Sequence, residues 1–238
     1  MPLFFCKSAL LSFLVSFIII FRMNSIPVLY EDDEIYVINK PAGLSVQGGQ
    51  GVKHSLDNDF AQQVGAKVYL VHRLDKDTSG LMIVAKSPFS ASKWTKLISS
   101  KAVKKEYLAI CAGRMKDKKG VITENVTQHG SEKSAVTYFT VEEEKTFTTK
   151  IEGYENIILS VIRLKLETGR MHQIRIHLAK NGCPIAGDDQ HGNFKLNKAL
   201  KKALKIKSLL LASVRLSLPL NGKEAVFQIE LPQHMKIC

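Results

Sequence analysis

The stretch His72-Arg73-Leu74-Asp75-Lys76-Asp77-Thr78-Ser79-Gly80 lies between two short apolar runs, residues 68–71 and 81–85. Two β-like runs joined by a polar loop that ends in glycine predict a strand–loop–strand unit at the rim of a sheet. Asp75 has a cation on each side, and nearby cations favour an ionised carboxylate. The pattern therefore predicts that Asp75 is a charged acceptor or nucleophile; the alternative is a turn whose charges are solvated.

The order of residues in this loop, His-Arg-Leu-Asp-x-x-Thr-Ser-Gly, resembles the signature of the RluA-type pseudouridine synthases. Five further blocks resemble that family and come in its order: Val37–Val46, Lys105–Ala109, Glu167–Leu178, Gly182–Asp188 and Leu211–Leu216. The resemblance implies an α+β pseudouridine synthase fold, in which a mainly antiparallel mixed sheet in two halves, with flanking helices, carries a central active-site cleft. It also implies that Asp75 is catalytic.

Arg175 lies on a helix predicted over residues 171–181, beside the apolar stripe of that helix. From the pattern alone it can equally be a surface arginine whose stem covers apolar neighbours. The resemblance places Arg175 against Asp75. A bidentate arginine–carboxylate pair would hold that carboxylate ionised and fixed in orientation.

Tyr107 occurs in a strand-like run, where packing against a neighbouring strand is the common role of a tyrosine. The resemblance makes Tyr107 the active-site tyrosine, whose ring stacks on the target base while its hydroxyl faces the reacting sugar. Leu211 matches a family leucine that packs against the base from the opposite side. The family often has His-Ala after that leucine, whereas this chain has Ala212-Ser213.

The remaining residues to which we assign substrate binding lie in the signature loop and in a basic helix predicted over residues 193–207. They are His72, Arg73, Leu74 and Thr78 from the loop, and Lys198, Lys202 and Lys205 from the helix. His72 is expected to have a structural or RNA-contacting role rather than that of a general base. The basic helix contains no acid, so its lysines repel one another unless an RNA backbone neutralises them; the alternative is a solvated face.

The chain has 238 residues, a formal net charge of +12 and 45% hydrophobic residues, which suits one sizeable domain with a core. A soluble protein this basic usually binds a polyanion, either nucleic acid or an anionic membrane. The cysteines form no Cys-x-x-Cys pair, so reduced thiols in a cytosolic protein are expected. His172 and His177 do not have the spacing of two ligands on one helix face, and no metal site is predicted.

Residues 1–22 are predicted to be an apolar N-terminal extension, and residues 23–238 to be the catalytic domain. The uncharged run 8–21 is shorter than the roughly 20 apolar residues that span a bilayer. Three interpretations stay open: an extension upstream of the true start at Met23, a membrane anchor, or a secretory signal. The resemblance implies a short form that lacks the small RNA-binding domain many members carry ahead of the catalytic one.

Local signals predict further elements along the chain. Helices are predicted over residues 56–64 and 88–98, the second with Ser87 as N-cap and Pro88 in its first position. Strands are predicted within residues 28–46, 103–112, 134–141, 157–166, 209–218 and 225–231. The acidic run Glu142–Glu144 is predicted to be a solvated turn. Because strands outnumber helices and short loops separate them, a mainly antiparallel α+β domain is expected.

The resemblance implies an RNA pseudouridine synthase that acts on uridine in ribosomal or transfer RNA. Its reaction breaks the N-glycosidic bond, turns the uracil and rejoins it through carbon 5, so no cofactor is expected. Asp75 would either attack the anomeric carbon or remove the neighbouring sugar proton, and the target nucleotide must be flipped out of its stack.

Two other classes of protein were weighed against this one. A non-catalytic RNA-binding protein on the same fold is disfavoured because Asp75, Tyr107 and Arg175 occur together. A membrane-surface protein would use residues 1–22 and the basic charge. We expect a cytoplasmic monomer whose partner is RNA, with no protein partner required and no membrane association.

Overall fold

The protein is described by a computed structural model that covers residues 25–49, 51, 53–128 and 130–237. The predicted apolar extension, residues 1–22, and the predicted start at Met23 lie outside these residues. Within the described part of the chain, no helix is long and apolar enough to cross a membrane.

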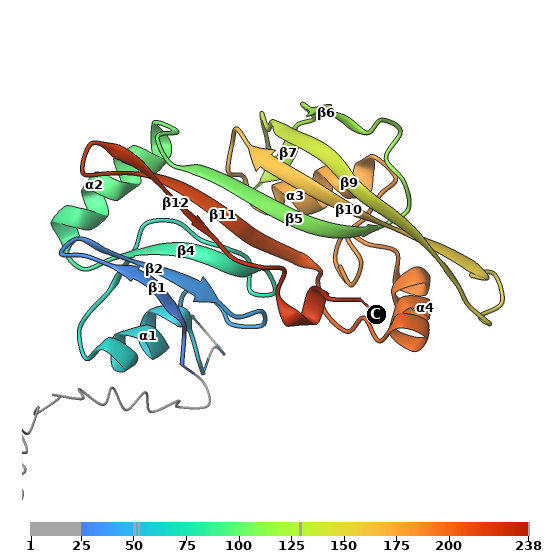
Figure 1. The fold of residues 1–238 in the computed structure, drawn as a ribbon, viewed down its shortest axis with the longest axis horizontal. Coiled ribbons are helices and arrows are strands. Elements are labelled where there is room, and N and C mark those ends of the chain that lie inside the picture. The colour runs from blue at the N-terminus through green and yellow to red at the C-terminus, as the bar shows by residue number, and fades with distance from the viewer. Residues whose placement is uncertain (1–24, 50, 52, 129, 238) are drawn as a thin grey trace, which may run out of the picture.

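A ten-stranded mixed sheet forms the frame of the molecule (Figure 1). Its strand order is β1-β2-β4-β11-β5-β10-β9-β6, while β3 pairs with β4 and β12 with β11. The strands are β1 Val28–Glu31, β2 Ile35–Lys40, β3 Tyr69–Leu70, β4 Ser79–Ala85, β5 Lys104–Ala112, β6 Lys119–Ile122, β9 Thr137–Thr148, β10 Asn156–Leu166, β11 Leu211–Leu220 and β12 Lys223–Gln228. A separate hairpin consists of β7 Val126–Gln128 and β8 Ser131–Lys133.

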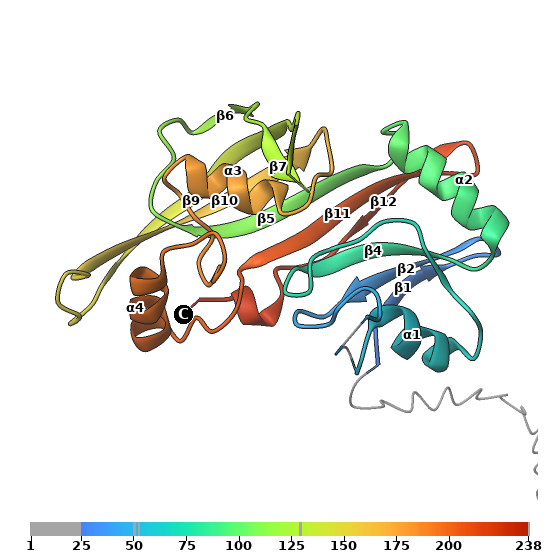
Figure 2. The same cartoon turned by 180° about the vertical axis from the view of Figure 1, so that it is seen from behind.

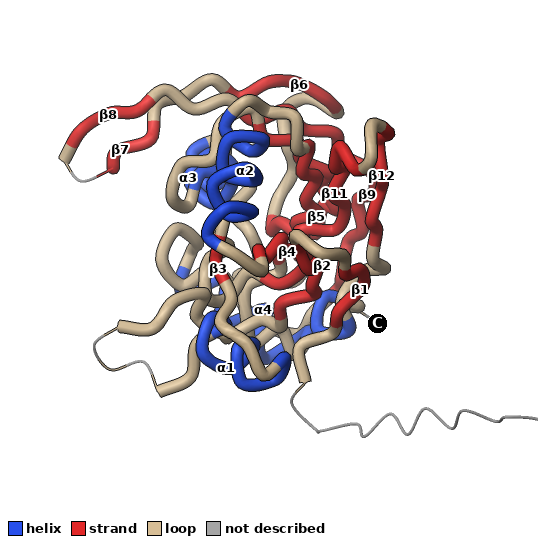
Figure 3. Tube along the Cα trace, turned by 90° about the vertical axis from the view of Figure 1, so that its left-hand side faces the viewer, coloured by secondary structure: helices blue, strands red, loops and turns tan. Residues whose placement is uncertain are grey.

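Four α-helices accompany the sheet in the described residues: α1 Leu56–Val64, α2 Pro88–Ser99, α3 Gln173–Lys180 and α4 Phe194–Leu204. A short 3-10 helix, Gln233–Met235, follows the last strand. Helix α3 crosses one face of the strands β5, β10 and β9 (Figure 2), and both α2 and α3 lie on the same side of the sheet (Figure 3). The predicted α+β class is therefore confirmed.

The sheet has two halves, which meet where β4 lies beside β11. Only Ser79 and Gly80 pair with β11 there, opposite Ala212 and Ser213, and this is the parallel contact of an otherwise antiparallel sheet. A Cβ on Gly80 would lie 2.2 Å from the carbonyl oxygen of Ser213, and the φ angle of Gly80 is +109°. Any other residue at position 80 would therefore push the halves apart. We call this two-residue contact the seam.

The predicted helix at residues 88–98 is confirmed as α2, and it shows how local signals and packing agree. Ser87 accepts a hydrogen bond from the backbone N–H of Ser90, and Pro88 occupies the first turn. Trp94 is almost fully buried, and its indole N–H donates to Glu34 at 3.0 Å. The helix thereby covers Leu81, Ile83 and other side chains of β4 that face away from the larger core cluster.

The acidic run Glu142–Glu144 is not a turn, and that prediction is wrong. It lies within β9, which pairs with β10 from Thr137 to Thr148. Glu142 forms an ion pair with Arg163 of β10, and Glu144 with Lys118 at 2.8 Å. The backbone ladder and these cationic neighbours override the weak strand preference of glutamate.

Two helix boundaries also differ from the predicted ones. Helix α3 begins at Gln173 rather than 171, because His172 has a left-handed backbone with φ of 55°. Helix α4 ends at Leu204, because Lys205 has φ of 59°, a conformation that commonly terminates helices. Lys205 therefore follows the basic helix instead of belonging to it.

Candidate active site

Asp75 lies in the loop between β3 and β4, beside the seam. Its carbonyl oxygen accepts from the N–H of Thr78 at 3.1 Å, which closes a turn. Its side chain is 21% exposed, so the carboxylate is accessible from outside the protein. The residue that brings this loop to the sheet is Gly80, since it permits the close approach to β11.

The buried Lys40 stabilises the loop that carries Asp75. Lys40, at the end of β2, donates from Nζ to the carbonyl oxygens of Pro41, Leu44 and Lys76, each at 2.9 Å. Burial lowers the pKa of Lys40 to about 8, although Asp77 and Asp75 oppose that shift. The side chain of Lys40 thus fixes the turn 40–44 to the loop that carries Asp75, together with a backbone bond from Gly43 N–H to the carbonyl oxygen of Lys76 at 2.9 Å.

Arg175 enters from α3 and lies between two carboxylates. Its Nη1 is 3.2 Å from Oδ2 of Asp75, while Nε and Nη2 each donate to Asp188 at 2.8 Å. The expected contact with Asp75 is present. The prediction that this pair is bidentate is wrong, because the bidentate contact is the one between Arg175 and Asp188. Burial opposes the charge on Arg175, yet the two carboxylates outweigh burial and raise its pKa.

Asp188 is a second acid of the site, and the sequence interpretation did not single it out. It is 1% exposed and also accepts the backbone N–H groups of Gln190 and His191, both at 3.0 Å. Burial would raise its pKa, but the bonds from Arg175 and from these backbone groups lower it overall. A Cβ on the preceding Gly187 would lie 2.1 Å from the carbonyl oxygen of Ser208, so the turn requires glycine there.

Two histidines lie against the acids. Nδ1 of His172 is 2.9 Å from Nε2 of His191, and the rings meet edge to face. Nε2 of His172 is 3.8 Å from Oδ1 of Asp75. Burial lowers the pKa of both imidazoles. Sequence reasoning considered His172 only as a metal ligand and missed His191, because their contact depends on the turn that Asp188 organises.

The assigned apolar residues Tyr107 and Leu211 lie on the neighbouring strands β5 and β11. Tyr107 on β5 lies opposite Ser213 of β11, and Leu211 begins β11. Tyr107, Leu211 and Leu74 are all buried and belong to one hydrophobic cluster. Burial, with the charge on Asp75, raises the pKa of Tyr107, so its hydroxyl stays protonated at neutral pH.

The other assigned loop residues face different surroundings. His72 uses Nε2 to accept the backbone N–H of Ile83 at 2.9 Å, and burial holds its pKa well below the usual range. Its geometry matches a structural role. Thr78 is 2% exposed, whereas Arg73 is exposed and free to meet a ligand.

The basic helix is joined to the site through its first turns. Asn197 of α4 accepts from the N–H of Gly187 at 3.1 Å and donates to the carbonyl oxygen of Asp188 at 2.9 Å. Lys198, Lys202 and Lys205 are all exposed. The lysines are therefore on a surface that is attached to the Asp188 turn.

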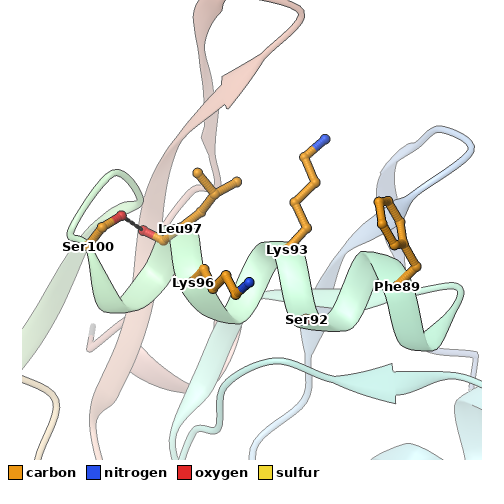
Figure 4. Close-up of a pocket in the computed structure, with 6 residues that line it drawn as sticks. All are labelled: Phe89, Ser92, Lys93, Lys96, Leu97 and Ser100. Atoms are coloured by element: carbon orange, nitrogen blue, oxygen red, sulfur yellow. Dashed lines mark hydrogen bonds between the residues drawn. The ribbon is translucent and has the colours of Figure 1, made fainter.

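Among the described residues, no group of three or more histidines, cysteines or acids is arranged to hold a metal ion. His177, which was weighed as a ligand, lies 3.0 Å from the hydroxyl of Thr137 and 2.9 Å from the carbonyl oxygen of Glu124. A hollow of about 420 Å³ lies elsewhere, along α2 (Figure 4). Its lining is Phe89, Ser92, Lys93, Lys96, Leu97 and Ser100, which includes none of the assigned residues.

The sequence is similar to those of known proteins. A family model described as RNA pseudouridylate synthase matches residues 34–180. A ribosomal large subunit pseudouridine synthase C of Rickettsia prowazekii is 36% identical over 209 residues, covering 86% of this chain and 68% of that protein. The protein of the same name in Escherichia coli is 34% identical over 228 residues, covering 89% and 68%.

Solved structures also resemble this one. The human RNA pseudouridylate synthase domain containing 4 protein aligns with a TM-score of 0.68 at 26% identity, covering 87% of this chain and 89% of that one. The human RNA pseudouridylate synthase domain containing 1 protein gives a TM-score of 0.70 at 20% identity, covering 87% and 83%. The fold predicted from the signature blocks is confirmed by these alignments.

Proposed function

Since the chain belongs to the RNA pseudouridylate synthase family and is thus a pseudouridine synthase, an isomerase, we propose that its substrate is a uridine of ribosomal RNA and that Asp75 starts the reaction. The ribosomal target is supported by relatives named as ribosomal large subunit pseudouridine synthases. Transfer RNA is the other substrate considered from the sequence. An enzyme of this kind would work in the cytoplasm, where ribosomes are made in bacteria such as those relatives come from.

The observation that carries the role of Asp75 is its pairing with a buried arginine that is itself held by another acid. Arg175 keeps one nitrogen on Asp75, so that the carboxylate meets a fixed cation on one side. Both chemical routes need a carboxylate that is held in one orientation, and Arg175 supplies that contact. The side chain of Asp75 is 21% exposed, so a flipped nucleotide can reach the carboxylate.

In the proposed reaction, Asp75 either attacks the anomeric carbon or removes the adjacent sugar proton. The bond between that carbon and N1 of uracil breaks, the uracil turns, and a new bond forms to carbon 5. Carbon 5 then loses its proton while N1 gains one, so that the product is an isomer of the substrate. No oxidant or reductant is consumed, and both routes remain open.

The apolar residues would receive the base. Tyr107 offers a ring for stacking and a protonated hydroxyl near Asp75, and Leu211 and Leu74 would form the opposing wall. Stacking of a base on an aromatic ring contributes about 1–3 kcal/mol. The exposed Arg73 and the exposed lysines of the α4 region would meet phosphates, which carry most of the affinity in such complexes.

The test of this function is a map of pseudouridines in ribosomal and transfer RNA from cells with and without the gene. We expect at least one site in large-subunit ribosomal RNA to disappear on deletion. It should return when the wild-type gene is restored, but not when Asp75→Asn is supplied. Loss of sites only in transfer RNA would refute the proposed substrate, and restoration by Asp75→Asn would refute the proposed residue.

A further inference from the structure

His172 has an uncommon backbone conformation for a residue other than glycine. It lies in the left-handed region with φ of 55° at the N-terminus of α3, and its side chain makes no capping hydrogen bond. Glycine or asparagine adopts this conformation at lower cost than other residues. Residues held in such conformations cluster at functional sites.

The side chain of His172 bridges a carboxylate and a second imidazole. Nε2 faces Oδ1 of Asp75 at 3.8 Å, which is longer than a hydrogen bond, and Nδ1 lies 2.9 Å from Nε2 of His191. A carboxylate accepts but cannot donate, so a neutral His172 carries its proton on Nε2. Nδ1 is then the acceptor, and His191 must donate from Nε2.

His191 is in turn fixed by the turn that Asp188 organises. The backbone N–H of His191 donates to Asp188 at 3.0 Å, and Asp188 also holds Arg175. One carboxylate therefore positions both groups that reach Asp75. Arg175 approaches Oδ2 directly, and His191 acts on Oδ1 through His172.

We propose that His172 and His191 are a positioning pair for Asp75, in which His191 sets the ring orientation and tautomer of His172, and neutral His172 steadies the free side of the carboxylate. This inference rests on the proposed role of Asp75. It adds two residues whose function is orientation rather than contact with the reacting atoms.

The pair also predicts a pH dependence. Burial lowers the pKa of both histidines, the negative charges of Asp75 and Asp188 oppose that shift, and Arg175 works in the same direction as burial. Arg73 adds to the lowering at His172. The pair is therefore neutral at pH 7 and gains a proton only below the usual histidine range. The proton turns His172 into a cation that binds Asp75 more tightly and blunts its reactivity.

The first test replaces His172 by glycine in the full chain. We expect the melting temperature to stay equal or rise, because the backbone strain is relieved, while the single-turnover rate falls roughly ten- to a hundred-fold. Affinity for RNA should change little. The rate is read as tritium release from carbon 5 of uridine in labelled total RNA from cells that lack the gene. Lys101→Gly is the matched control, since Lys101 has φ of 64° at the end of α2.

The second test separates donation from titration. His191→Gln keeps a donor for Nδ1 of His172, so it should retain more of the rate at pH 7 than His191→Leu, which should lose about as much rate as His172→Gly. His172→Gln keeps a donor toward Asp75 and cannot titrate, so it should recover part of the rate and lack the acidic fall that histidine protonation causes in wild type.

The outcomes are distinct. Wild-type rates and pH profiles in both His172→Gly and His191→Leu would overturn the proposal. A parallel loss of melting temperature and rate in His172→Gly, with no difference between His191→Gln and His191→Leu, would show a structural role only. Should Asp75→Asn retain activity, the proposed function fails instead, whatever the histidine variants do.

Discussion

Asp188 holds Arg175 with both carboxylate oxygens at 2.8 Å each, and so leaves a single guanidinium nitrogen for the catalytic candidate Asp75. The stronger, bidentate interaction is thus the structural one. The weaker interaction, at 3.2 Å, reaches the carboxylate that has to react. Because Asp188 fixes Arg175, the guanidinium can orient the Asp75 carboxylate but cannot move together with it.

Asp75→Asn should abolish turnover while RNA binding persists. The amide keeps the shape of the side chain but removes the charge that both chemical routes need, and phosphate contacts elsewhere carry most of the affinity. Tritium release and filter binding measure the two properties. Asp77→Asn, the same substitution at an exposed neighbouring position, is the control. Turnover by folded Asp75→Asn near the wild-type rate would contradict the assignment.

Asp188→Asn should destabilise the fold by about 3–5 kcal/mol, because a buried cation loses its main partner. Turnover should fall too, since Arg175 and His191 are no longer fixed. Urea unfolding gives the free energy of unfolding. Asp189→Asn changes the adjacent exposed acid and should alter neither property; similar losses in both variants would show that the buried contact is not the cause.

The same acid predicts how stability depends on pH. The pKa of Asp188 is lower in the folded protein than its ordinary value, so its stabilising effect is complete above that value and disappears as the pH falls through the lowered one. Wild type should therefore lose free energy of unfolding below about pH 4 more steeply than Asp188→Asn does. Parallel curves for the two proteins would contradict this prediction.

Tyr107→Phe should keep RNA affinity within about two-fold and lower turnover by roughly a hundred-fold, within the range for loss of a positioned proton-transfer group. The ring still stacks, but the hydroxyl that burial and Asp75 keep protonated is gone. Single-turnover kinetics separate the two effects. Near-normal turnover would leave Tyr107 as a packing residue of β5.

Replacing Lys198, Lys202 and Lys205 by glutamine should weaken RNA binding and flatten its salt dependence. The expected change is up to about 0.9 units of log–log slope per lost duplex contact, or about 0.7 for a single strand. The control changes three exposed lysines elsewhere, Lys133 in β8, Lys150 in the loop after β9 and Lys223 in β12, and so removes the same net charge. If the two triple variants show equal salt slopes of RNA binding, the lysines of the α4 region form a solvated face and do not contact RNA.

Local signals were enough to predict the helices. The bounds of α1 agree with the predicted ones, and α2 begins at the predicted cap and proline. The signature loop and the apolar runs around it were sufficient to locate Asp75. These features depend on residues close together in the chain, where propensity and spacing act directly.

The remainder of the site depends on distant partners. Asp75 and Arg175 are 100 positions apart, and the bidentate role of Asp188 follows only when α3 and the Asp188 turn meet. The glutamates of β9 look like a solvated turn until Arg163 and Lys118 are beside them. The contact between His172 and His191 likewise requires a left-handed backbone at His172, which no local sequence signal predicted.

The seam gives the chain an order of assembly during its synthesis. Strand β4 and the Asp75 loop are made early, yet the strand against which Gly80 lies begins only at Leu211. A nascent chain that has already emerged as far as α3 holds Asp75, Tyr107 and Arg175, but β11, which lies between β4 and β5, is still missing. A chain that ends at α3 therefore lacks Ser213, the residue against which both Gly80 of β4 and Tyr107 of β5 are paired in the complete sheet.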